Sequence, residues 1–123
     1  KGERALLNFG HTLGHAIEKE MNFSLYHGEC VVLGMIAALN ICVELGTITA
    51  NERDDALKTF ALYEFPDHVT GIKIDDVVAV SKNDKKMDAG KVKFILLKSV
   101  GDAYIDRDIT DDQMRRALEG VIR

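Results

Sequence analysis

The segment from Glu29 to Leu45 constrains the fold more than any other feature, because it is apolar almost all the way round a helix. A helix of this kind has no polar face for solvent, so other elements must bury it on most sides. Gly46 follows it directly and suits the C-cap position. The apolar stretches are interrupted by Gly, Glu or Asn, short of the roughly 18 residues that a membrane span needs. We therefore expect the central helix of a helical domain and no membrane association.

Other segments also carry helical patterns and helix-capping residues. Thr49 with Glu52, and Thr110 with Gln113, have the spacing of capping boxes that begin helices. Asp75 is expected to be an N-cap as well, because its side chain can accept from a backbone N–H. The spacing of apolar residues predicts four further helices, at Arg4–Met21, Ala50–Tyr63, Lys73–Asn83 and Asp111–Val121.

Two short runs favour strands rather than helices. Val92–Leu97 and Ala103–Ile105 are β-prone and lie on either side of Gly101, which predicts a small hairpin. Asn22–Gly28 and the polar segment 84–90 are expected to be loops. The predicted architecture is one mainly helical domain over residues 1–123, with a small β-hairpin.

Composition excludes several classes of protein. Of the 123 residues, 46% are apolar and 29% are charged, which argues against a disordered chain. The net charge of -4 argues against a nucleic-acid binder that works through a basic surface. Cys30 and Cys42 both fall in the apolar segment, so we expect buried, reduced thiols and a cytoplasmic protein. Because the chain begins at Lys1 without Met or a signal-peptide pattern, we also expect it to be part of a longer protein.

Histidines supply the clearest candidate chemistry. His11 and His15 share one helix face at i, i+4 spacing and could bind one metal ion, although the zinc-protease motif would need Glu after the first histidine. His27 stands just before the apolar segment and could be brought against the first helix. Gly10 and Gly14 would permit a close approach of the two helices. The spacing alone leaves open which histidines are the ligands.

The same helix face also suits an anionic substrate. Arg4 and Asn8 precede the first histidine by seven and three residues, and so lie on or near its face. A guanidinium binds carboxylate or phosphate through two hydrogen bonds. Lys85 and Lys86 are either solvated or contribute to binding the same anion.

These residues together resemble a known family, 3-dehydroquinate synthase. The similarity lies in three motifs that occur in the family's order and with its spacing: Arg4–Glu18, His27–Met35, and the segment from Asp84 through Gly90 and Val92–Leu97 to Gly101. The resemblance implies that residues 1–123 are the C-terminal helical domain, which binds metal and substrate. It also implies that an N-terminal NAD-binding domain lies outside this chain.

The resemblance further implies an activity. Enzymes of this family are cytoplasmic lyases of the shikimate pathway to chorismate and the aromatic amino acids, and are usually homodimers. They convert 3-deoxy-D-arabino-heptulosonate 7-phosphate, a sugar phosphate, to 3-dehydroquinate and phosphate. They use NAD and a divalent metal, zinc or cobalt. The domain alone is expected to be inactive, because the NAD site and a glutamate metal ligand belong to the other domain.

Site residues follow from the resemblance by position. It selects His11 and His27, rather than the His11–His15 pair, as the metal ligands. His15 corresponds to a catalytic and substrate-binding histidine. The other implied substrate-binding residues are Arg4 for the carboxylate, Asn8 for the phosphate, and Lys85 or Lys86 for the phosphate.

Three alternatives stay open at this level. A related sugar-phosphate cyclase, such as 2-deoxy-scyllo-inosose synthase, would share the metal histidines. A metal-dependent polyol or alcohol dehydrogenase would have a similar helical metal domain. A stand-alone helical binding or assembly module would need no catalytic residues at all.

Overall fold

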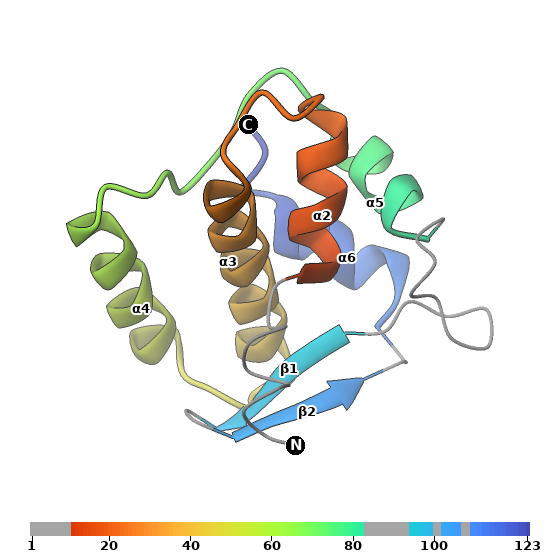
Figure 1. Cartoon of the computed structure of the whole chain (residues 1–123). Coiled ribbons are helices and arrows are strands. Elements are labelled where there is room, and N and C mark those ends of the chain that lie inside the picture. Colours follow the sequence, from red (N-terminus) through yellow and green to blue (C-terminus); the bar gives the residue numbers. More distant parts are fainter. Residues whose placement is uncertain (1–10, 83–93, 100–101, 107–108) are drawn as a thin grey trace.

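The structure is a computed structural model that describes residues 11–82, 94–99, 102–106 and 109–123, with side chains over 12–82 and 109–123. The described residues form five helices and one two-stranded sheet (Figure 1). The mainly helical architecture predicted from the sequence is confirmed. In chain order the elements are α2 (His11–Glu20), α3 (His27–Leu45), α4 (Ala50–Leu62), α5 (Ile74–Lys82), β1 (Phe94–Ser99), β2 (Asp102–Asp106) and α6 (Asp111–Leu118).

Helix α3 is the centre of the fold. Helices α2, α4 and α6 and strand β1 all pack against it, and α5 packs against α2 and α6 (Figure 1). The largest fully buried side chains come from several elements and include Leu13, Ile17, Leu33, Met114 and Leu118. The amphipathic helices α2, α5 and α6 thus bury their apolar faces on α3 and on one another, as their sequence patterns require.

The limits of α3 differ from the prediction at one end. It begins at His27, two residues before the predicted start, so the predicted loop ends at Tyr26. Tyr26 has extended backbone angles, and the Glu29 carboxylate accepts a hydrogen bond from its N–H at 3.2 Å. This start was missed because Tyr26 is not a typical capping residue. At the other end Gly46 is the C-cap, as predicted, with φ of 80°.

The length of α3 corrects a second expectation. This 19-residue helix, with a mean hydropathy of 1.8, is long and apolar enough to cross a membrane by length and composition. The expectation that no segment reaches that length was therefore wrong. Within the fold, however, α3 is the core helix, and 56% of its most apolar 18-residue stretch is buried. Its buried residues are Cys30, Val32, Leu33, Gly34, Ile36, Ala37, Ala38, Leu39, Ile41 and Cys42.

Capping determines where α4 and α6 begin. Thr49 Oγ1 accepts from the Glu52 N–H at 3.1 Å, and Glu52 accepts from the Thr49 N–H at 2.9 Å. Thr110 and Gln113 form the same reciprocal pair at the start of α6. Both predicted capping boxes are confirmed. Helix α4 ends one residue before the predicted limit, and α6 ends at Leu118 rather than Val121.

Helix α5 does not use the predicted cap. It begins at Ile74, and the Lys73 carbonyl accepts from the N–H groups of Asp76 and Val77. Asp75 therefore lies inside the first turn, and its carboxylate accepts from Arg115 Nε at 2.8 Å. The prediction of Asp75 as the N-cap was wrong because a partner on α6, distant in sequence, competes for its side chain.

The strands β1 and β2 pair in antiparallel fashion, with Leu96 opposite Tyr104. Their register shifts between Leu97 and Ser99. β1 overlaps the first predicted run over residues 94–97, and β2 includes the second. The predicted loop 84–90, the residues that join the strands, and the part of the first helix before His11 all lie outside the described residues.

Candidate metal and substrate site

Helices α2 and α3 approach each other closely at Gly14. A Cβ atom at this position would lie 2.8 Å from the Cys30 carbonyl oxygen and 3.2 Å from the Val31 Cα. Only glycine fits this contact, because both neighbours are backbone atoms and cannot rotate away. The predicted role of a glycine in helix approach is confirmed for Gly14, whereas Gly10 lies outside the described residues.

This approach brings the start of α3 against the end of α2. His27 is the first residue of α3, and its Nδ1 atom lies 3.2 and 3.1 Å from the two carboxylate oxygens of Glu18 on α2. His15 Nδ1 lies 3.8 Å from Glu18 Oε1. One carboxylate therefore stands between two imidazole rings that come from different helices.

Burial differs sharply within this group. The Glu18 side chain is only 11% exposed, whereas His27 and His15 are 65% and 40% exposed. The carboxylate is the buried member of the group, and both imidazole rings are exposed to solvent, where a ligand could contact them. Burying a carboxylate is unfavourable without hydrogen bonds, and His27 supplies one.

Cys30 lies beside this group but is not suited to metal binding or nucleophilic chemistry. Burial, together with the negative charges of Glu18 and Glu29, raises the pKa of the Cys30 thiol to about 11. The thiolate is the form that attacks electrophiles and binds metals, and little of it exists near neutral pH. Both cysteines are buried and neither forms a disulfide, as predicted.

The structure describes some of the predicted site residues and not others. It brings His15 and His27 to the same carboxylate. His11 is the first residue of α2, but its side chain lies outside the described part. The remaining predicted positions, Arg4, Asn8, Lys85 and Lys86, also lie outside it. Among the side chains that are described, no three His, Cys, Asp or Glu residues are grouped to hold a metal ion.

Glu18 is the site residue that the sequence analysis missed. It falls three residues after His15 and seven after His11, so it shares their helix face. This spacing was the available signal. It was overlooked because a glutamate near the end of a helix is usually solvated.

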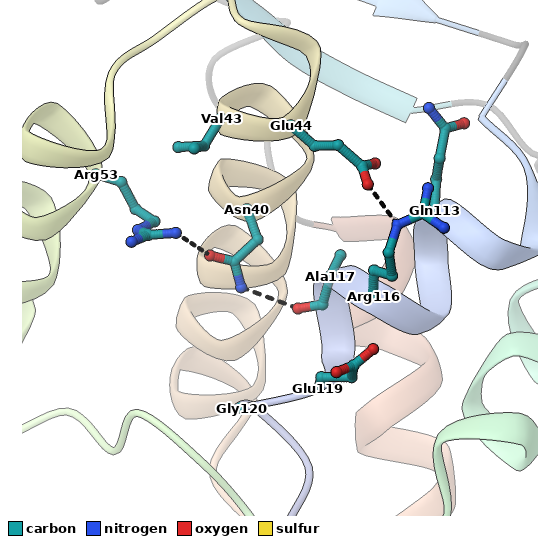
Figure 2. A pocket seen from close by; sticks show the side chains of 9 residues that line it. All are labelled: Asn40, Val43, Glu44, Arg53, Gln113, Arg116, Ala117, Glu119 and Gly120. Atoms are coloured by element: carbon teal, nitrogen blue, oxygen red, sulfur yellow. Dashed lines mark hydrogen bonds and ion pairs between the residues drawn. The ribbon is translucent and has the colours of Figure 1, made fainter.

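A separate cavity of about 340 Å³ opens between α3, α4 and α6 (Figure 2). Arg53 Nη1 donates to Asn40 Oδ1 at 3.3 Å, and Asn40 Nδ2 donates to the Ala117 carbonyl at 2.9 Å. Arg116 pairs with Glu44 across the same opening. Figure 2 shows these groups directed at one another, so we interpret the cavity as a hydrogen-bonded joint between the three helices.

A family model describes the part of the chain that carries this site. The model of the 3-dehydroquinate synthase C-terminal domain matches residues 1–87. The chain therefore belongs to the family of 3-dehydroquinate synthase C-terminal domains. Residues 1–87 include every candidate site residue named above.

Curated relatives agree with this assignment. The chain is 39% identical over 125 residues to 3-dehydroquinate synthase from Nostoc punctiforme, with 98% of the chain and 34% of the relative covered. It is 40% identical over 118 residues to 3-dehydroquinate synthase from Acetivibrio thermocellus, with 95% of the chain and 33% of that relative covered. The chain thus spans about a third of the length of the relatives it matches.

A solved structure shows the same fold. The 2-epi-5-epi-valiolone synthase from Streptomyces hygroscopicus subsp. jinggangensis 5008, with NAD+ and Zn2+ bound, superposes with a TM-score of 0.83. The two are 25% identical in sequence, and the match covers 94% of this chain and 32% of that one.

Proposed function

We propose that this chain is the metal- and substrate-binding domain of a 3-dehydroquinate synthase. In this proposal the full-length enzyme converts 3-deoxy-D-arabino-heptulosonate 7-phosphate to 3-dehydroquinate and phosphate. The observation that carries it is the family match over residues 1–87, which spans His11, His15, Glu18 and His27. The NAD-binding domain, the homodimer and the cytoplasmic location belong to the same proposal.

The residues present suit a divalent metal. We assign His11 and His27 as its ligands, because imidazole nitrogens suit zinc and cobalt. His27 already has a carboxylate on its Nδ1, which is the usual support for a metal-bound histidine. When bound, the metal supplies Lewis-acid activation of the substrate hydroxyls, and NAD supplies reversible hydride transfer.

The other proposed residues bind and orient the sugar phosphate. Arg4 pairs with the substrate carboxylate through its planar guanidinium, and Asn8 donates to the phosphate. Lys85 or Lys86 adds a positive charge for the phosphate. His15 contacts the substrate near its phosphate group. Such groups accelerate a reaction by fixing the substrate and stabilising developing charge.

A related sugar-phosphate cyclase is the second candidate. The fold match to 2-epi-5-epi-valiolone synthase favours it, because that protein has the same domain architecture over this chain. The curated relatives favour the synthase instead, since they are 39% and 40% identical and the cyclase is 25% identical. A polyol dehydrogenase and a stand-alone binding module have no specific support.

The decisive experiment is turnover by the full-length protein. With zinc and NAD, we expect phosphate release from 3-deoxy-D-arabino-heptulosonate 7-phosphate, with loss of nearly all activity in His27→Ala. His68→Ala is the matched control, because His68 lies outside the site and pairs with Asp67 at 2.8 Å. Turnover of a different sugar phosphate instead would replace the proposal with another cyclase.

A further inference from the structure

We propose that Glu18 is a positioning residue for the metal site, which holds His27 in the tautomer and orientation that present Nε2 to the metal. The inference rests on the proposed function for the identity of the ligand. It rests on geometry alone for the contact between Glu18 and His27.

The hydrogen bond determines which ring nitrogen carries the proton. A carboxylate has no hydrogen to donate, so at 3.1 Å the donor must be His27 Nδ1–H. In the neutral ring Nε2 then carries the lone pair, which is the electron pair that a metal needs. The tautomer of a metal-binding histidine is generally set in this way by the partner of its other nitrogen.

The position of Glu18 makes this control effective. Both carboxylate oxygens lie within 3.2 Å of His27 Nδ1, so the ring nitrogen is shared between the two oxygens. The buried side chain of Glu18 lies in the α2–α3 interface, where Gly14 brings the two helices together. The largely exposed ring of His27 is therefore hydrogen-bonded to a buried carboxylate rather than to an exposed surface side chain.

The same carboxylate also serves the second histidine. His15 Nδ1 lies 3.8 Å from Glu18 Oε1. One buried group thus couples the proposed ligand on α3 with the proposed substrate-binding histidine on α2. A displacement of Glu18 would disturb both imidazoles together.

Nitrogen-15 NMR of the whole 123-residue chain, labelled at its four histidines, tests the contact without metal. We expect the His27 resonances, assigned by their loss in His27→Ala, to report the Nδ1–H tautomer. Glu18→Gln should abolish that preference, and Glu20→Gln on the same helix should preserve it. An Nε2–H tautomer in the unmodified chain would overturn the proposal. The variant His27→Ala serves only to assign the resonances, and the tautomer is read from the unmodified chain.

Zinc titration of the full-length protein tests the consequence. We expect Glu18→Gln to weaken zinc binding by about 10- to 100-fold, His27→Ala to weaken it further, and Glu20→Gln to leave it unchanged. Glu18→Asp, which retains the charge, should restore part of the affinity. Unchanged affinity in Glu18→Gln would overturn the positioning role. Unchanged affinity in His27→Ala would instead reject the proposed metal site, while the tautomer measurement would still judge the Glu18 contact.

Discussion

At the scale of single residues, Gly14 has the most direct effect on how α2 meets α3. We expect Gly14→Ala to destabilise the fold, because its Cβ would clash with the backbone of Cys30 and Val31. Overpacking of this kind costs about 1–3 kcal/mol, partly offset by the roughly 1 kcal/mol that alanine gains over glycine in a helix. Urea unfolding measures the net loss.

Gly28→Ala is the matched control for that substitution. Gly28 lies in the first turn of α3. Beyond its own helix turn, no atom of the described residues lies within 4 Å of the position that a Cβ would take there. It should therefore leave the free energy of unfolding unchanged or raise it. An equal loss in both variants would show that the close approach at Gly14 is not the cause.

Cys30 gives the fold a specific alkaline sensitivity. Its pKa is raised from 9.0 to about 11 in the folded chain, chiefly by burial. As the pH rises from 9 to 11, the unfolded state loses the thiol proton while the folded state keeps it, so stability falls across this interval. Well below pH 9 both states are protonated and the effect is absent.

Urea unfolding at pH 8 and at pH 10.5 measures this effect. Lysines and tyrosines also titrate at high pH, so the comparison must include Cys30→Ala. We expect the loss of stability between the two values to be smaller in Cys30→Ala than in the unmodified chain. Identical losses in the unmodified chain and in Cys30→Ala would exclude a contribution from this thiol.

At the scale of elements, the two capping boxes should respond differently to the same substitution. Thr49→Ala and Thr110→Ala each remove a cap worth about 1 kcal/mol. No residue of α4, described in full, is buried, whereas α6 buries Met114, Ala117 and Leu118. Because little packing holds α4, we expect Thr49→Ala to increase hydrogen exchange mainly within α4.

Thr110→Ala should instead lower the stability of the whole fold, because α6 belongs to the core. Hydrogen exchange by mass spectrometry distinguishes the two outcomes peptide by peptide. Uniform exchange changes across the chain in Thr49→Ala would contradict the local response of α4.

Elements with strong local signals were predictable from sequence. The Thr49 and Thr110 caps and the Gly46 C-cap fix their helix ends by bonds between residues three to five apart, which a sequence displays directly. Asp75 was assigned wrongly because its partner, Arg115, is 40 residues away. Local capping chemistry gives no information about such a contact.

The site was predictable only in part, for a related reason. Motif resemblance selected His27, and spacing placed His15 on the helix face that also carries Glu18. Neither indicated that Glu18 is buried between them, since that depends on the α2–α3 approach at Gly14. A tertiary contact between two helices decides the role of this carboxylate.

At the scale of the whole molecule, the chain contains an incomplete metal site by our proposal. Structural and catalytic zinc sites use three or four protein ligands, and His11 and His27 supply two. We therefore expect the 123-residue chain to bind zinc only weakly, above micromolar Kd, and to release no phosphate from the heptulosonate substrate. Joining the chain to the NAD-binding domain should give tight zinc binding and phosphate release, because in our proposal that domain brings a further metal ligand and the cofactor.

Calorimetry with zinc on the chain and on the full-length protein checks this prediction. His27→Ala should abolish the weak binding by the chain, and His68→Ala should not affect it, because His68 lies after α4 and pairs with Asp67. Sub-micromolar binding by the chain that is lost in His27→Ala would show that this domain completes the site by itself. The division of the ligands between two domains would then be wrong, although the family assignment would stand, because it rests on residues 1–87 and on relatives that the chain matches over 95% or more of its length.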